Sequence, residues 1–356
     1  MDRPGTEFSD DTFLFQDTFV FASSVLASSA ARGKNKITGT SGDDTLNGTG
    51  KGDIIRGLKG DDRLDGAKGN DNVDGGAGKD KIFISPGKDK IDGGTGRDTL
   101  DASRLDGGVV INATATGKGF PSVDAQSITL SDGTIQSVVN IENFLGSKFG
   151  DTFYGDANGG VLKGRGGDDW LESTGIGARL VGGGGKDRLR ADGDNSKLMG
   201  GTGADNLSAF GVGMTALGGR GDDQISFAYD LGSKVGRPVN VIRGGAGNDT
   251  LTWLDSDTDS DLLPPVFKVF GGAGADVFDF GFYESGTIQD FQPGIDKVDL
   301  TVHLSRETPT FAQLKGMITD TAAGAVLKLD FDSVVNFEFV FKGVTAADFV
   351  DGDFIF

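Results

Sequence analysis

The residues best suited to chemistry in this sequence are aspartates that recur at every ninth position. Seven nine-residue units run without a gap from Gly39 to Asp101, each with aspartate at its sixth position and a large aliphatic residue at its eighth. These aspartates are Asp44, Asp53, Asp62, Asp71, Asp80, Asp89 and Asp98. A glycine-rich turn that ends in a carboxylate offers side-chain and backbone oxygens, the donors that hard cations such as Ca²⁺ prefer. The spacing therefore predicts a regular series of cation sites.

Each unit combines a glycine-rich turn with a very short strand that carries one inward-facing apolar side chain. The units resemble the nonapeptide GGxGxDxUx of the RTX proteins, in which U is apolar. This resemblance implies an all-β fold: a right-handed parallel β-roll, or β-solenoid, with calcium in its turns. Two units then make one coil, so that every second unit stacks on the same edge and the ions lie between stacked turns.

The nine-residue repeat resumes at Gly146, but only every second unit has aspartate at its sixth position. The aspartates of this second block are Asp151, Asp169, Asp187, Asp205, Asp223, Asp249 and Asp276. The intervening units carry Gly160, Ala178, Ser196 and Met214 at the same position. Because alternate units lie on opposite edges, the second block should hold calcium along one edge. The other edge, which lacks these aspartates, is called the bare edge, and its turns lengthen after Ser226 and after Thr252.

Stacking gives five pairs of units in the first block and six in the second, so we expect about eleven calcium ions. Composition agrees with a cation-loaded solenoid: the chain has 61 glycines and 53 acidic against 34 basic residues, for a formal net charge of −19. This charge argues against nucleic acid or an anionic membrane as a partner. Cysteine is absent, so the chain has neither disulfides nor a thiol nucleophile. Metal binding is therefore the expected source of additional stability.

We divide the chain into five segments on this basis. They are an N-terminal cap or tail (1–37), a two-edged calcium β-roll (38–101), a β-rich interruption (102–145), a one-edged calcium β-roll (146–283) and a C-terminal cap with a type I secretion signal (284–356). The apolar stretch from Thr18 to Ala31 is too short and serine-rich to span a bilayer, so we expect no membrane span. The residues before it are mainly acidic, unlike the positively charged start of a secretory signal.

The C-terminal segment departs from the repeat. Residues 284–301 resemble the segment that closes RTX rolls, and the resemblance implies that Asp290 and Asp296 hold a last ion. The sequence after Thr308 and Pro309 has the start signal and spacing of a short helix. Two alternating stretches, AVLKLDF and NFEFVFKGV, predict strands. The terminal DGDFIF is typical of the secretion signals of this family, and the alternative is a last strand of the sheet.

Groups suited to catalysis are few. His303 is the only histidine, and a capping or surface role suits it better than catalysis. The sequence contains no HExxH zinc-protease motif and no GxSxG nucleophile motif, so we expect no enzyme. Glu142 and the other glutamates follow no pattern. Trp170 and Trp253 follow aspartate-bearing turns and are candidates for exposed contacts with sugars.

These observations predict a secreted calcium-binding protein of a Gram-negative bacterium. It would leave the cell unfolded through the type I secretion apparatus and fold on calcium outside, where a surface, matrix or host-contact role without catalysis is expected. The alternative is a carbohydrate-modifying or carbohydrate-binding accessory of the epimerase or lyase type, with cell-surface or extracellular polysaccharide as its partner. Residues 102–145 and the bare edge of the second block would be its contact surfaces.

Overall fold

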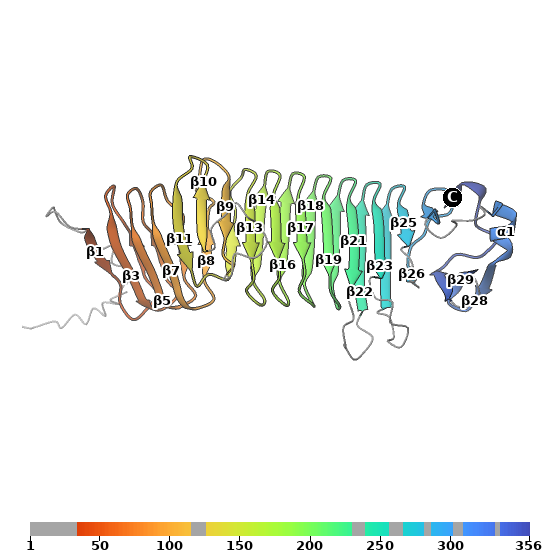
Figure 1. Ribbon diagram of the computed structural model, residues 1–356, viewed down its shortest axis with the longest axis horizontal. Helices are drawn as coiled ribbons and strands as arrows, with labels where there is room; N and C mark the ends of the chain where they lie inside the picture. The colour runs from red at the N-terminus through yellow and green to blue at the C-terminus, as the bar shows by residue number, and fades with distance from the viewer. Residues whose placement is uncertain are drawn as a thin grey trace, which may run out of the picture.

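The computed structural model describes residues 34–114, 126–229, 239–255, 266–280, 286–301, 309–331 and 335–356. These residues form a long β-roll whose strands alternate between two sheets, one of 16 strands and one of 15 (Figure 1). The fold is therefore the predicted parallel β-roll, and the described residues include no helix long and apolar enough to cross a membrane.

In the first block each coil contributes one strand to each sheet. The 16-stranded sheet receives β1 (Asn35–Thr38), β3 (Asp53–Lys59), β5 (Asn72–Gly78) and β7 (Lys90–Gly96). The 15-stranded sheet receives β2 (Thr45–Asn47), β4 (Arg63–Asp65), β6 (Lys81–Phe83) and β8 (Thr99–Asp101). Neighbouring strands are parallel and offset by two units, so that Ile55 lies opposite Val73. The strands β3, β5 and β7 have seven residues and are longer than the very short strands expected, because their pairing continues into the glycine turn that follows.

Residues 102–145 add a reversal to one sheet only. The strands β9 (Val109–Asn112), β10 (Ser127–Leu130) and β11 (Ile135–Val139) enter the 16-stranded sheet in the order β7-β11-β10-β9-β13. The strand β10 is antiparallel to both of its neighbours. In the other sheet β12 (Asn143–Leu145) pairs in parallel with β8 and β14, so the coil continues without a break there.

The second block repeats the coil with two parallel rows of strands. The 16-stranded sheet contains β13 (Thr152–Gly155), β15 (Trp170–Ser173), β17 (Arg188–Ala191), β19 (Asn206–Phe210), β21 (Gln224–Tyr229), β23 (Thr250–Asp255) and β25 (Val277–Phe280). The 15-stranded sheet contains β14 (Val161–Gly166), β16 (Arg179–Gly184), β18 (Lys197–Thr202), β20 (Thr215–Arg220), β22 (Val239–Ala246), β24 (Val266–Ala273) and β26 (Gly286–Ile288).

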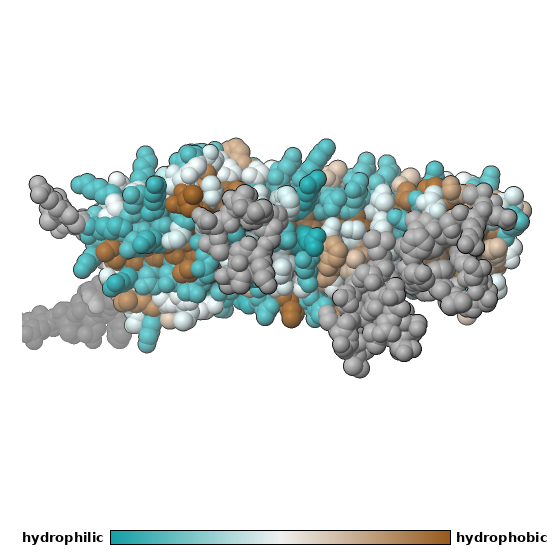
Figure 2. Space-filling view, viewed as in Figure 1, coloured by the Kyte–Doolittle hydropathy of each residue, from teal (hydrophilic) through white to brown (hydrophobic). Residues whose placement is uncertain are grey.

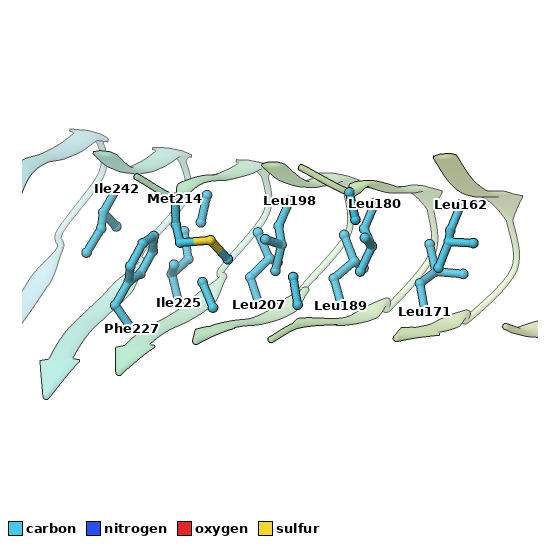
Figure 3. Packing of buried hydrophobic residues seen from close by; sticks show 14 of the residues in the cluster. Leu162, Leu171, Leu180, Leu189, Leu198, Leu207, Met214, Ile225, Phe227 and Ile242 are labelled. Carbon is cyan, nitrogen blue, oxygen red and sulfur yellow. The ribbon is translucent and has the colours of Figure 1, made fainter. Parts of the chain in front are cut away.

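The core is a narrow row of aliphatic side chains between the sheets. Leu171, Leu189 and Leu207 point inward from one sheet toward Leu180 and Leu198 of the other (Figure 3). All five are buried. The outer face seen in Figure 2 is largely hydrophilic along the roll, with apolar residues in narrow bands. Each strand thus buries few apolar side chains, which limits what hydrophobic burial contributes.

A small C-terminal unit closes both sheets. It contains β27 (Lys297–Asp299), α1 (Phe311–Gly316), β28 (Ile318–Thr321), β29 (Gly324–Phe331), β30 (Val335–Phe341), the 3₁₀ turn η1 (Asp351–Asp353) and β31 (Phe354–Ile355). The strand β30 extends the 15-stranded sheet and β31 extends the other. The predicted helix is confirmed, with Thr310 as its N-cap and Gln313 completing a capping box.

Aromatic residues fill the closed end. The rings of Phe341 and Phe349 lie 5.0 Å apart, and Phe291 contacts both. Bulk of this kind covers the end of a solenoid, whose open strands would otherwise pair with other chains. At the other end, the proposed N-terminal cap lies outside the described residues except for residues 34–37.

Candidate calcium sites

Two rows of turns join the sheets. We call the turns that lead from the 16-stranded into the 15-stranded sheet the Asp44 edge, and the turns that lead back the Asp53 edge. The Asp44 edge contains Asp44, Asp62, Asp80 and Asp98. The Asp53 edge contains Asp53, Asp71, Asp89, Asp151, Asp169, Asp187, Asp205, Asp223, Asp249, Asp276 and Asp296.

A hydrogen-bond ladder connects these aspartates along each edge. The backbone N–H of one aspartate donates to Oδ1 of the aspartate in the next coil, as from Asp53 to Asp71 at 2.7 Å and from Asp187 to Asp205 at 2.9 Å. The ladder runs without a break from Asp151 to Asp296. Beyond the first aspartate of each row in the first block, Asp44 and Asp53, each ladder carboxylate has Oδ1 committed to a backbone N–H. The second oxygen, Oδ2, can then bind something else.

In ten turns that second oxygen is buried and accepts no hydrogen bond from the described residues. We call these the open turns. They are the turns of Asp62, Asp71, Asp80, Asp98, Asp169, Asp187, Asp205, Asp223, Asp249 and Asp276. A buried acceptor without a partner costs about 1–3 kcal/mol, and more when it carries charge. A cation bound at each Oδ2 would remove this penalty.

The backbone of the open turns is shaped to supply further oxygens. In all ten, the second and the fourth residues have positive φ, including the non-glycine residues Leu58, Ala67 and Arg165. A Cβ added at Gly96 would lie 1.6 Å from the carbonyl oxygen of Gly78 in the preceding coil. One added at Gly57 would lie 2.1 Å from Oδ2 of Asp62. Carbonyl and carboxylate oxygens therefore crowd the first and fourth residues of the turn, where only glycine leaves room, and this donor set fits Ca²⁺.

Four of the five remaining aspartate turns, all but that of Asp89, are closed by a backbone N–H that donates to Oδ2. The N–H groups of Thr40, Thr49 and Ser147, each the second residue of its turn, donate to their own aspartate at 2.5–2.6 Å. These three residues lack the positive φ of the open turns. In the turn of Asp296 the donor is the N–H of Gln292, at 2.8 Å. The closed turns of Asp44, Asp53 and Asp151 begin the rows, and the turn of Asp296 ends one.

Each open turn offers one buried carboxylate oxygen, so the other protein ligands of a cation there would be backbone oxygens. Among the described residues, no group of three or more acidic, histidine or cysteine side chains is placed to hold a metal ion. The site therefore differs from a side-chain cage. Its geometry depends on the stacking of consecutive coils, and a cation there would couple each coil to its neighbour.

Burial raises the pKa of several ladder carboxyls. It raises the pKa of Asp169 to about 8 and that of Asp223 to about 7, with the neighbouring carboxylates of the row adding to both shifts. The hydrogen bond from the preceding aspartate N–H opposes the shift in each case. Without a cation, the folded row therefore holds protons that an unfolded chain would release.

This proton uptake predicts that calcium binds more weakly in acid. The folded-state pKa of Asp169 and of Asp223 lies above the ordinary aspartate value near 3.9. Their protonation thus stabilises the calcium-free roll below pH ~4, and this contribution is lost as pH rises through ~8. Calcium must displace these protons, so the half-saturating calcium concentration should be several-fold higher at pH 6 than at pH 8. Titrations in buffers of different ionisation enthalpy would measure the released protons, and a pH-independent midpoint without proton release would contradict the expectation.

On the Asp44 edge of the second block, uncharged residues take over the ladder. The N–H of Ala178 donates to Oγ of Ser196 at 3.0 Å, and the N–H of Met214 donates to Oδ1 of Asn240 at 2.9 Å. Ser196 in turn donates its N–H toward Sδ of Met214 at 3.3 Å. Among the described residues, this part of the edge keeps its stacking without a carboxylate at the ladder position.

Two carboxylates that accept backbone N–H groups of the ladder turns were missed in the sequence. Glu142 accepts the N–H of Asp98 at 2.8 Å, so the interpretation of Glu142 as patternless is wrong. If the repeat that begins at Gly146 is extended by one unit toward the N-terminus, Glu142 falls at the sixth position of that unit. This spacing could have identified it. Asp353 accepts the N–H of Gly294 at 2.7 Å and that of Val350 at 2.9 Å, but no repeat marks it in the sequence.

Other candidate residues have different positions from those expected. Trp253 is fully buried and stacks on Phe267, so it is not an exposed sugar contact, whereas Trp170 is 37% exposed. Oδ1 of Asp290 accepts the N–H of Gly271 at 2.9 Å, which places Asp290 beside the last open turn. His303 lies outside the described residues.

The sequence was compared with known protein families, curated proteins and solved structures. The sequence matches the RTX calcium-binding nonapeptide repeat over residues 29–50 and 47–82, and the serralysin C-terminal domain of the M10 peptidases over residues 91–352. A search of curated proteins finds no match. A crystal structure of the extracellular lipase LipA from Serratia marcescens is similar at 16% identity, over 89% of this chain and 40% of the lipase chain, with a TM-score of 0.18.

The serralysin C-terminal match, over residues 91–352, covers well over half of the sequence. Nonapeptide repeats of this kind bind calcium, and a serralysin-type C-terminal domain points to type I secretion out of a Gram-negative cell. The chain therefore belongs to the serralysin C-terminal family of RTX calcium-binding β-roll proteins.

Proposed function

We propose that this protein binds one calcium ion at each of its ten open turns and folds outside the cell when these sites fill. The observation that carries the proposal is the set of ten buried Oδ2 atoms without a hydrogen-bond partner among the described residues. Each ion would bind a ladder carboxylate and backbone carbonyls of stacked turns. The closed turns of Asp44, Asp53, Asp151 and Asp296 would end the rows and supply only part of a site.

The energetics favour folding that depends on metal. Each strand buries few aliphatic side chains, and a fully buried one contributes about 1.5–3 kcal/mol. Ordering the backbone costs roughly 1–2 kcal/mol for every residue. Hydrophobic burial in so thin a roll does not offset that cost, so binding free energy must supply the difference. Calcium is scarce in the cytosol and abundant outside the cell, which would keep the chain unfolded until export.

The division of the chain follows the same logic. We propose calcium on both edges over residues 38–101 and on the Asp53 edge alone over residues 146–283, with residues 284–356 serving as both cap and secretion signal. The last strand, β31, pairs with β27. A signal that is extended during export would thus become the final strand of the sheet after folding.

After export we propose a structural role at the cell surface, in the matrix or in contact with a host, without catalysis. The burial of Trp253 removes half of the tryptophan pair considered for sugar contact, which weighs against the carbohydrate-binding alternative. A glycan array at millimolar calcium distinguishes the two roles, because selective binding of one polysaccharide class would favour the alternative.

Two adjacent aspartates allow a matched test of the sites. Asp169 carries a buried, unpartnered Oδ2, whereas Asp168 in the same turn is exposed and accepts the N–H of Lys186 at 2.8 Å. Replacing either by asparagine removes one negative charge and keeps an oxygen acceptor. Asp169→Asn should bind at least one calcium fewer than the wild-type protein in equilibrium dialysis, and Asp168→Asn should bind the same number. Equal counts for the two variants would contradict the assignment.

A further inference from the structure

The turn of Asp89 differs from every open turn because a glutamine side chain fills its interior. Oδ2 of Asp89 lies 2.9 Å from Nε2 of Gln136. The same nitrogen lies 2.6 Å from the carbonyl oxygen of Ser85 and 2.9 Å from that of Gly87. The side chains of Ser85, Asp89 and Gln136 are all buried. One amide nitrogen therefore lies within hydrogen-bond distance of three oxygens of a single turn.

These three oxygens come from the second, fourth and sixth residues of the nine-residue unit that starts at Ile84. The sixth-residue oxygen is the one left without a partner in the open turns. All three neighbours are acceptors, so the amide must present its –NH₂ group to them, because its oxygen would meet only other oxygens. Nitrogen–oxygen distances of 2.6–2.9 Å are only slightly longer than the 2.3–2.6 Å of calcium–oxygen contacts. The amide thus lies where a cation would bind.

The hairpin in residues 102–145 explains how a glutamine comes to this place. The strand β11 pairs in parallel with β7, with Ser137 opposite Lys90. Gln136 therefore stands next to Asp89, in the position that the ladder aspartate of the next coil occupies elsewhere. The strand β11 follows its antiparallel partner β10 through a short hairpin turn rather than through a turn of the nine-residue repeat. The next coil thus brings a side-chain donor in place of further carbonyls.

We propose that the Gln136 amide replaces calcium in the turn of Asp89, so that the first row of sites on the Asp53 edge ends there without an ion. The inference rests on the proposed calcium sites of the open turns and adds that one stacked turn is permanently filled by the protein itself. Counting one ion for each unit that stacks on a preceding unit of its row, the turn of Asp89 is the one of these eleven described units whose Oδ2 has hydrogen-bond partners, Gln136 and Ser85. Its closure brings the expected number of ions from about eleven to the ten open turns.

Anomalous scattering from crystals of the wild-type protein grown with calcium tests this directly. We expect peaks in the open turns and none within bonding distance of Asp89 Oδ2. A peak bonded to Asp89 Oδ2 and to the carbonyl oxygens of Ser85 and Gly87 would overturn the inference. If the open turns also lack peaks, the proposed calcium sites fail instead, so the two failures are distinguishable.

Calcium counting on a variant gives a second test. Gln136→Ala removes the amide and leaves three oxygens around an empty position, so it should bind one calcium more than the wild-type protein in equilibrium dialysis. Gln224→Ala removes the same atoms from an exposed site on β21 and should leave the count unchanged. A wild-type count in a Gln136→Ala protein that retains its β-sheet signal would refute the replacement. If Gln136→Ala does not fold, the anomalous map of the wild-type protein still decides.

Discussion

Removing calcium with a chelator is expected to abolish most of the β-sheet signal of this protein in circular dichroism. Ten buried carboxylate oxygens would then have no partner among the described residues. At about 1–3 kcal/mol for each unpartnered acceptor, their summed penalty of about 10–30 kcal/mol equals or exceeds the roughly 5–15 kcal/mol by which a typical protein is stable. Repulsion along each row adds to this cost. No rearrangement of a few side chains can compensate, because the carboxylates lie along nearly the whole roll.

The identity of the cation provides the control. Magnesium demands near-octahedral geometry at shorter distances and keeps several waters. A turn whose carbonyl oxygens are fixed in place is therefore a poor binding site for it. Adding back calcium after chelation should restore the signal, whereas an equal concentration of magnesium should restore little of it. Sodium chloride at matched ionic strength separates specific binding from screening. An unchanged β-sheet signal in excess chelator would show that the roll folds without metal and would contradict the proposed mechanism.

The regular part of this architecture follows from the spacing of nine. Two units per coil set a register of eighteen residues, which places Ile55 opposite Val73 and aligns the aspartates of alternate units on one edge. The loss of aspartate from every second unit after Gly146 then predicts a single carboxylate row, and the structure shows Ser196, Met214 and Asn240 as acceptors on the other edge. These inferences need only local periodicity.

The contacts that close the rows depend on segments without that periodicity. Gln136 reaches Asp89 because the β10–β11 hairpin enters the sheet beside β7, and no spacing in the sequence encodes that return. Asp353 meets Gly294 only after the C-terminal strand pairs with β27. Whether a turn is open or closed is also hard to read from residue types, since Leu58 and Arg165 adopt the positive φ that the repeat pattern assigns to glycine. Stacking against the neighbouring coil imposes it on them.

A single methyl group in the row of open turns is expected to cost more than the loss of one calcium ligand. Gly203 is the fourth residue of its turn, with φ of 127°, and an added Cβ would lie 1.8 Å from the carbonyl oxygen of Gly185. Gly203→Ala therefore combines backbone strain of about 1–3 kcal/mol with an overlap that only separation of two coils can relieve. Such separation would disturb the oxygens around Asp187 and Asp205 together. We expect a several-fold higher calcium midpoint for folding and the loss of more than one bound ion.

Gly177→Ala is the control, because it places an alanine at positive φ without the overlap. Gly177 also has positive φ, at 69°, but lies on the Asp44 edge of the second block, and an added Cβ would meet nothing within 4 Å. Its N–H bond to the carbonyl oxygen of Asp194 survives the substitution. This variant should shift the calcium midpoint slightly and bind the wild-type number of ions. If both variants shift the midpoint equally and keep all ions, strain alone accounts for glycine in these turns, and the crowding of oxygens around a cation is not what excludes a side chain.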